Sequence, residues 1–164
     1  MKKKSVLYLL FVVLWCSFIF LLSDTPSKES NKASKSVIET TTIETVKRTN
    51  DLKITNINTN DKKWKNKIVN QLNTPVRKIA HGVIYFVLSI IFFLLLRSMK
   101  IDSKKAILWT IAFCFLYSTT DEIHQTFVLE RSGRLLDCLI DTLGAILGSI
   151  FIYKLLPNKG NIKV

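Results

Sequence analysis

The residues that could do chemistry form two short polar clusters beside apolar segments. The first cluster is Arg77-Lys78-Ile79-Ala80-His81, and the second is Asp121-Glu122-Ile123-His124-Gln125. Histidine titrates near neutral pH and can act as a general acid or base, and a carboxylate can orient it. If the protein is an enzyme, the catalytic candidates are therefore His81, Asp121, Glu122 and His124.

A second set of polar residues could bind a ligand. A guanidinium group presents two N–H donors that match two oxygens of a phosphate, and carboxylates and amides can hold the remaining polar atoms of a headgroup. The binding candidates are Arg77, Lys78, Gln125, Arg131, Arg134, Asp137 and Asp141.

Neither a metal nor a cofactor is expected. Two histidines with carboxylates can bind zinc, but the chain has no HExxH motif and its histidines lie in different predicted helices. Its three cysteines form no CxxC, so they predict neither a disulfide framework nor a thiolate site. The sequence has no nucleotide-binding loop, no Rossmann fingerprint and no GxSxG motif.

Four apolar segments must position these clusters. A helix that crosses a hydrocarbon core of about 30 Å needs roughly 17–25 residues. The third segment is apolar only to Tyr117, so a crossing helix has to continue to Ile123, which brings Asp121 and Glu122 to the membrane edge. The sequence predicts an all-α membrane protein, a bundle of four transmembrane helices at about 6–22, 79–96, 106–123 and 139–156.

The first apolar segment also resembles a signal peptide, because Lys2, Lys3 and Lys4 precede it. Its apolar run from Val6 to Leu22 is longer than the roughly 7–15 residues of a signal peptide, and no cleavage site follows. We therefore expect a retained helix.

A long polar segment, 23–78, separates the first and second predicted helices within a single domain, 1–164. It is rich in Ser, Thr, Asn and Lys, and too few apolar residues are present to offset ordering, so we expect part of it to be mobile. Trp64, Ile68 and Leu72 recur every four residues and predict a short amphipathic helix before Pro75, either on the membrane or in solvent.

The charge pattern predicts orientation. The net charge is +12 and 48% of the residues are hydrophobic. The basic residues lie between apolar segments, and the sequence has no nucleic-acid-binding signature, which argues against a nucleic-acid partner. The 120–138 loop holds four acidic and two basic residues, whereas the N-terminal tail, the 97–105 turn and the C-terminal tail are basic. The positive-inside rule then predicts a multi-pass cell-membrane protein with both termini in the cytoplasm and 23–78 outside.

Helical spacing places the polar residues of each helix on one face. The faces are Arg77, His81 and Tyr85; Tyr117, Asp121, His124 and Gln125; and Asp137, Asp141, Gly144 and Gly148. Gly144 and Gly148 form a GxxxG pair, which permits close helix packing.

Charges inside a bilayer cost about 2.5–3.5 kcal/mol each, so we expect a polar, water-accessible pocket between the second, third and fourth helices at the outer face. The alternative is simple pairing, of Arg77 or Lys78 with Asp121 or Glu122, and of Arg131 or Arg134 with Asp137 or Asp141.

These residues also resemble the VanZ-like family over essentially the whole chain. The resemblance is carried by 77–81, by Asp121-Glu122-Ile123-His124-Gln125-Thr126-Phe127, and by Arg131-Ser132-Gly133, Asp137, Asp141 and Gly144, with Trp15 in agreement. Such proteins are small bacterial membrane proteins, named from one linked to resistance to teicoplanin, a glycopeptide antibiotic that binds cell-wall precursors. The resemblance therefore implies a role in the cell envelope.

Two positions depart from the family pattern. Leu129-Glu130 stands where the family often has Pro-Gly, which puts a tight loop in doubt. Asp141 stands where the family often has Asn, which adds an acid to the predicted pocket.

Three functions remain as hypotheses. The first is an envelope protein that influences teicoplanin susceptibility through a pocket that binds an envelope lipid or a lipid-linked cell-wall precursor. The second is a membrane enzyme acting on a lipid-linked substrate, with His124 and Asp121 as acid–base groups, and the sequence leaves open whether catalysis occurs. The third is a transporter, which is less favoured because the third and fourth predicted spans have no charged residue at their middle.

Overall fold

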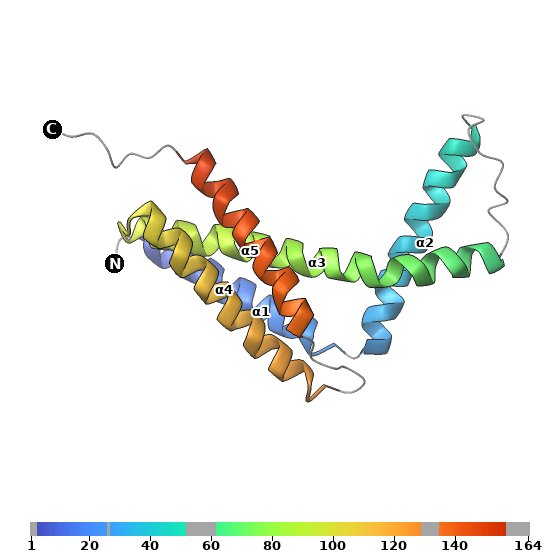
Figure 1. Ribbon diagram of the computed structural model, residues 1–164, viewed down its shortest axis with the longest axis horizontal. Coiled ribbons are helices and arrows are strands. Elements are labelled where there is room, and N and C mark those ends of the chain that lie inside the picture. The colour runs from blue at the N-terminus through green and yellow to red at the C-terminus, as the bar shows by residue number, and fades with distance from the viewer. Residues whose placement is uncertain (1–2, 26, 52–61, 129–134, 157–164) are drawn as a thin grey trace. The chain divides into compact units, whose positions relative to one another are not determined.

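The computed structural model describes residues 3–25, 27–51, 62–128 and 135–156. Within these ranges the chain forms five helices and no strand: α1 (Lys3–Ser23), α2 (Ser27–Asp51), α3 (Lys62–Ser98), α4 (Ser103–Gln125) and α5 (Leu135–Leu155) (Figure 1). The predicted all-α class is confirmed. The chain divides into two compact units, Met1–Thr25 with Ile79–Val164, and Pro26–Lys78.

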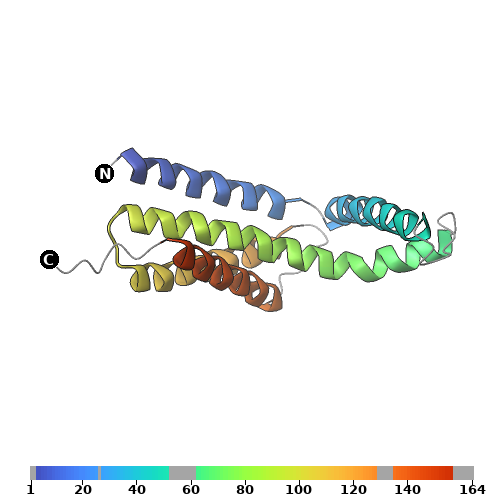
Figure 2. The same ribbon diagram turned by 90° about the horizontal axis from the view of Figure 1, so that it is seen from above.

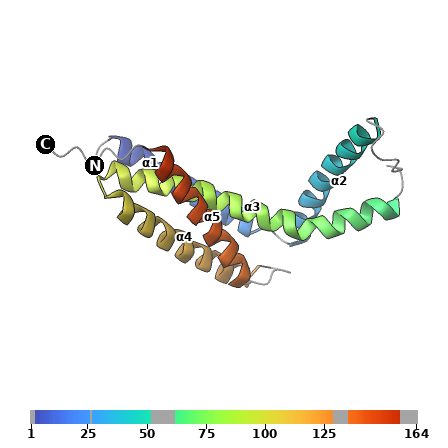
Figure 3. The same cartoon turned by 45° about the horizontal axis from the view of Figure 1, so that its top comes forward.

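The helices of the first unit alternate in direction. The last part of α3 runs antiparallel to α1 (Figure 2), where Ser98 Oγ donates to Ser5 Oγ at 3.0 Å and Trp15 Nε1 donates to the carbonyl oxygen of Ile84 at 3.1 Å. The chain then reverses into α4 and again into α5, and α4 and α5 lie side by side (Figure 3). The ends of these helices therefore gather at two opposite ends of the unit.

Three of the described helices are long and apolar enough to cross a membrane, namely α1, the Asn66–Ser98 part of α3 and the Leu136–Leu155 part of α5. The predicted third span, 106–123, is helical within α4 but does not reach the same hydropathy. The polar run from Ser118 to Glu122 lowers the hydropathy of its last part. Four transmembrane helices are therefore not confirmed by length and composition.

The first unit exposes apolar side chains and buries polar ones beside two buried hydrophobic clusters, one around Tyr85 and Leu88 and one around Phe93 and Leu96. Several leucines on α4 and α5 are more than half exposed, while carboxylates and hydroxyls on the same helices are buried. The exposed leucines include Leu108, Leu116, Leu136, Leu139, Leu143 and Leu147; the buried polar residues include Thr110, Ser118, Asp121, Asp141 and Ser149. Exposed apolar surface together with buried polar side chains is the pattern of a membrane protein.

Glycine allows α3 and α5 to approach closely. A Cβ atom on Gly144 would meet the backbone carbonyl of Gly82, and one on Gly148 would meet the Phe86 carbonyl oxygen and Ser89 Oγ. The close packing predicted for the GxxxG pair is confirmed, and its partner is the backbone of α3.

The turn between α3 and α4 is closed by backbone hydrogen bonds. Lys100 has φ 65°, and the N–H groups of Lys100 and Ile101 donate to the carbonyls of Arg97 and Leu96 at 3.0 and 3.1 Å. This is a Schellman motif with a lysine in the left-handed position that glycine favours. Asp102 then caps α4 by accepting from the Lys104 N–H at 3.0 Å.

The second unit contains α2 and the first part of α3. The polar stretch 23–78, for which partial mobility stays a prediction, includes the 25-residue helix α2. No Gly or Pro interrupts it, and threonines bond back to the preceding turn, as Thr45 does to Thr41 at 2.8 Å. The helix predicted around Ile68 and Leu72 is present, but it continues through Pro75, so the predicted end before Pro75 is wrong.

Candidate functional site

A buried polar face of α4 forms one wall of the candidate site. Its residues follow the i, i+3, i+4, i+7 spacing that places side chains on one side of a helix. They are Ser118, Asp121, Glu122 and Gln125, and each is less than 8% exposed. The opposite side of α4 is apolar and exposed, so the helix directs its polar groups into the first unit.

Asp141 is the centre of the site. It belongs to the second turn of α5 and is 1% exposed. Ser118 Oγ on α4 donates to Asp141 Oδ2 at 2.6 Å, and His81 Nδ1 on α3 lies 4.0 Å from Asp141 Oδ1. Three helices therefore bring one hydroxyl, one carboxylate and one imidazole together.

The order of these groups differs from that of a nucleophile–histidine–acid triad. In such a triad the imidazole stands between the hydroxyl and the carboxylate and takes the hydroxyl proton. Here the carboxylate of Asp141 stands between Ser118 and His81, and Ser118 donates directly to it. The arrangement presents acceptor oxygens and does not activate Ser118 through His81.

Two buried oxygens at the site have unused hydrogen-bonding capacity. Asp141 Oδ1 and the hydroxyl of Tyr85 make no hydrogen bond within the described residues. Tyr85 is fully buried on α3, with its ring centroid 6.4 Å from that of Tyr117. Buried polar atoms are almost always hydrogen-bonded, so these two atoms indicate a place where a further donor belongs.

Asp121 and Gln125 form a local pair beside Asp141. Gln125 Nε2 donates to Asp121 Oδ2 at 3.1 Å, one turn along α4. Within the described part of the first unit, no Lys or Arg pairs with Asp121 or Asp141.

His124 belongs to a different neighbourhood. Its Nε2 lies 3.9 Å from Asp24 Oδ1, just beyond α1, and its ring centroid is 4.4 Å from that of Phe20. Asp121 or Glu122 was the orienting acid expected for His124, whereas the structure places His124 against the end of α1. The two histidines thus face different carboxylates.

Two further acidic residues flank these carboxylates in the sequence: Glu122 follows Asp121, and Asp137 lies four residues before Asp141. Glu122 is buried on α4, and Asp137 lies in the first turn of α5. A carboxylate in a first helical turn is stabilised by the positive end of the helix dipole, so Asp137 contributes to the stability of α5.

Arg77 and Lys78 belong to the second unit. Arg77 Nη1 donates to Asn31 Oδ1 at 2.9 Å, and Asn73 Nδ2 donates to the same oxygen at 2.9 Å. Ser34 Oγ donates to Asn73 Oδ1 at 2.5 Å. Arg77 therefore has a structural role, joining α2 to the start of α3. The candidates Arg131 and Arg134, and the 129–130 departure, lie outside the described residues.

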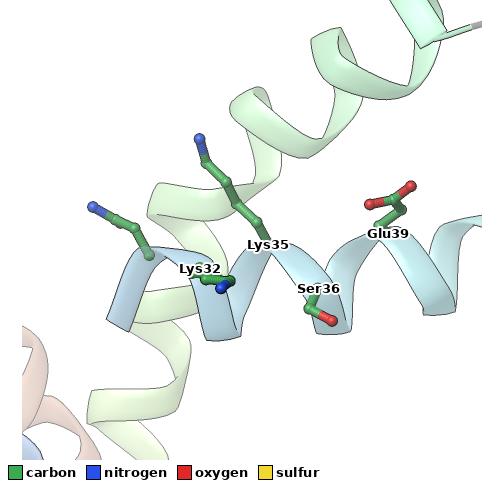
Figure 4. Close-up of a pocket in the computed structure, with 5 residues that line it drawn as sticks. Lys32, Lys35, Ser36 and Glu39 are labelled. Carbon is green, nitrogen blue, oxygen red and sulfur yellow. The ribbon is translucent and has the colours of Figure 1, made fainter. Parts of the chain in front are cut away.

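A surface hollow in the second unit is a weaker candidate. All of its lining residues come from α2: Asn31, Lys32, Lys35, Ser36 and Glu39. Lys35 and Glu39 project from one side of the helix and Ser36 from the other (Figure 4). Ligand sites need groups that converge from several directions, and one helix does not provide them.

Sequence reasoning missed Ser118, Tyr85 as a site residue, and Asp24. Ser118 could have been found from its spacing, because it completes the face that contains Asp121, Glu122 and Gln125. No signal in the sequence identifies Asp24 as the partner of His124. Within the described residues, no group of three or more His, Cys, Asp or Glu side chains could hold a metal ion.

Comparison with known proteins identifies one family. The family model described as VanZ/LLP1 matches residues 8–157, which confirms the resemblance found in the motif residues. No curated protein and no solved structure matches the chain.

Proposed function

The chain belongs to the VanZ/LLP1 family of membrane proteins, and from that premise we propose that it binds the polar headgroup of an envelope lipid or lipid-linked cell-wall precursor and thereby changes susceptibility to teicoplanin. The observation that carries the proposal is the buried carboxylate of Asp141, which has one oxygen satisfied by Ser118 and the other oxygen open toward His81. Buried polar atoms are almost always hydrogen-bonded, so the open oxygen supports a bound donor.

The proposal includes a topology of four crossings with both termini in the cytoplasm. Two features support α4 as the additional crossing. Its apolar side chains are exposed while its polar ones are buried, and its direction alternates with those of its neighbours. The basic residues Lys3, Lys4, Arg97, Lys100, Lys104, Lys105 and Lys154 then belong to the end of the first unit opposite Asp141, in agreement with the positive-inside rule.

Cysteine labelling tests this topology. Lys100 precedes α4 and Phe127 follows it, and Phe127 is 83% exposed. In a background without Cys16, Cys114 and Cys138, we expect a membrane-impermeant maleimide to label F127C from outside intact cells. K100C should react only after permeabilisation. Equal labelling of both from outside would exclude α4 as a crossing.

Drug susceptibility tests the function. We expect expression of the wild-type chain to lower teicoplanin susceptibility and surface binding of the drug in a sensitive bacterial host, and D141N to abolish most of that change. The matched control is L143A, two positions away on α5, because Leu143 is 59% exposed and points away from the site. Equal effects of D141N and L143A, at equal membrane abundance, would overturn the proposal.

A membrane enzyme is the second candidate. The observation that favours it is the proximity of His81 Nδ1 to Asp141 Oδ1, since an imidazole near a carboxylate can serve as a general base. This pair suits acid–base work better than His124 with Asp121, because His124 faces Asp24. Purified protein would have to convert a lipid-linked substrate, and H81Q would have to lose turnover while H124Q retains it.

A further inference from the structure

We propose that the second unit docks on anionic phospholipid headgroups through a basic cluster at the end where it joins the apolar helices. The basic cluster consists of Lys32 and Lys35 on α2 and of Arg77 and Lys78 on α3. This inference goes beyond the proposed function, because it concerns a docking surface for the lipid bilayer and does not involve Asp141.

Hydrogen bonds between side chains hold the two halves of the basic cluster together. Arg77 Nη1 donates to Asn31 Oδ1 at 2.9 Å, and Ser34 Oγ donates to Asn73 Oδ1 at 2.5 Å. Asn31 and Ser34 are one turn apart, so they lie on the same side of α2. That side is therefore fixed against the part of α3 that precedes Ile79.

The two lysines lie on the adjoining, exposed side of α2. Lys32 follows Asn31 and Lys35 follows Ser34, so each is turned by about 100° from the side that faces α3. Both lysines are exposed and line the same surface hollow. Residues three apart on a helix have Cβ atoms about 5–6 Å apart, which allows both ammonium groups to contact neighbouring phosphates. Glu39 lines the hollow beyond Lys35, so the headgroups belong at the Lys32 end.

Both chain connections of the second unit keep the basic cluster near the bilayer. Helix α2 begins at Ser27, four residues after α1 ends at Ser23, and four residues of extended chain reach at most about 14 Å. Lys78 directly precedes Ile79, which is 65% exposed and begins the predicted span 79–96. The cations therefore lie close to the depth of the headgroups.

The charge of the second unit selects an anionic surface. Residues 26–78 contain twelve Lys or Arg and five Asp or Glu, and basic segments next to a membrane span are attracted to anionic lipid. A guanidinium group has five N–H donors, of which the bond from Arg77 to Asn31 uses one. Phosphatidylcholine offers the same phosphate, but its trimethylammonium group carries a positive charge that a basic cluster repels.

Lipid retention by the full chain tests the inference. The wild-type protein is purified in nanodiscs that contain equal amounts of phosphatidylglycerol and phosphatidylcholine, and bound lipid is measured by native mass spectrometry. We expect preferential retention of phosphatidylglycerol. K32Q/K35Q should lower the ratio of phosphatidylglycerol to phosphatidylcholine by about fivefold or more, the effect of at least one basic residue near an anionic surface.

K47Q/R48Q is the matched control. It also removes two exposed charges from α2, but Lys47 lies twelve residues beyond Lys35, a helical rise of about 18 Å. That distance exceeds the Debye length of about 10 Å at 0.1 M salt, so this variant should retain the wild-type ratio. An unchanged midpoint of thermal unfolding in K32Q/K35Q would assign its loss to charge and exclude misfolding.

Two results would overturn the inference. One is a wild-type retention ratio in K32Q/K35Q, and the other is an equal fall of the ratio in K32Q/K35Q and K47Q/R48Q. Sodium polyphosphate, a soluble phosphate polymer, is the comparison probe. If it binds the wild type more tightly than K32Q/K35Q while the lipid ratios of the two proteins are equal, the basic cluster binds a soluble polyanion and docking on lipid is wrong.

Discussion

At the scale of single residues, the two oxygens of Asp141 have unequal partners. Oδ2 accepts from Ser118, and Oδ1 faces His81 across 4.0 Å. The importance of Asp141 could be predicted from its residue type at the start of an apolar helix. Its partners could not, because serine is common in membrane helices and its hydrogen bond depends on how α4 packs against α5. Likewise the contact of His124 with Asp24 requires the position of α1, which no periodicity supplies.

The glycine contacts give a prediction at this scale. G144A places a Cβ against the Gly82 carbonyl on α3, and forcing the helices apart should lower the free energy of unfolding by about 1–3 kcal/mol. G82A is the matched control, because its Cβ would lie 3.6 Å from Ile140 Cγ2, an ordinary contact. Thermal unfolding in detergent measures both. Equal stability of the two variants would contradict the close approach of α3 and α5.

At the scale of elements, apolar runs predicted α1, α4, α5 and the last part of α3 within a few residues. They could not predict α2, whose two buried apolar residues, Ile38 and Val46, are isolated in a polar sequence. Pro75 also misled the prediction, because proline removes a backbone donor and usually ends a helix. Contacts of Asn73 and Arg77 with α2 lie on both sides of Pro75 and help to maintain the helix there.

The turn before α4 gives a second prediction. Lys100 has φ 65°, which costs an L-residue roughly 1 kcal/mol relative to glycine. K100G should therefore raise the free energy of unfolding by up to about 1 kcal/mol, and K100V should lower it because a β-branched residue resists this conformation. Denaturant unfolding of the three proteins measures the order. A less stable K100G would contradict the Schellman geometry.

The cap of α4 gives a third prediction, in pH. The Lys104 N–H holds the pKa of Asp102 below its ordinary value of 3.8. A lowered pKa means that the ionised cap stabilises the folded state above pH 3.8, and that this contribution is lost as pH falls through the lowered pKa. The stability difference between the wild type and D102A should therefore shrink in acid. D102N keeps a neutral acceptor, so its difference from D102A should not change with pH over that range.

At the scale of the whole molecule, the composition predicted a membrane protein and the family match agrees. Four crossings stay a prediction, because three of the described helices are long and apolar enough to cross a membrane and the polar residues of α4 lower its hydropathy. Ser118, Asp121 and Glu122 would be tolerable in a crossing helix only if its neighbours bury them, and all three residues are buried here. The mean hydropathy of a sequence segment does not depend on whether its polar side chains are buried by neighbouring helices.

A double-mutant cycle on teicoplanin susceptibility tests the central claim most directly. Ser118 and Asp141 form one hydrogen-bonded unit between α4 and α5, so their substitutions should be non-additive. We predict a partial loss of the drug effect in S118A, a nearly complete loss in D141N, and no further loss in S118A/D141N, all at wild-type membrane abundance. A wild-type drug effect in D141N, or losses that add in the double variant, would contradict the account.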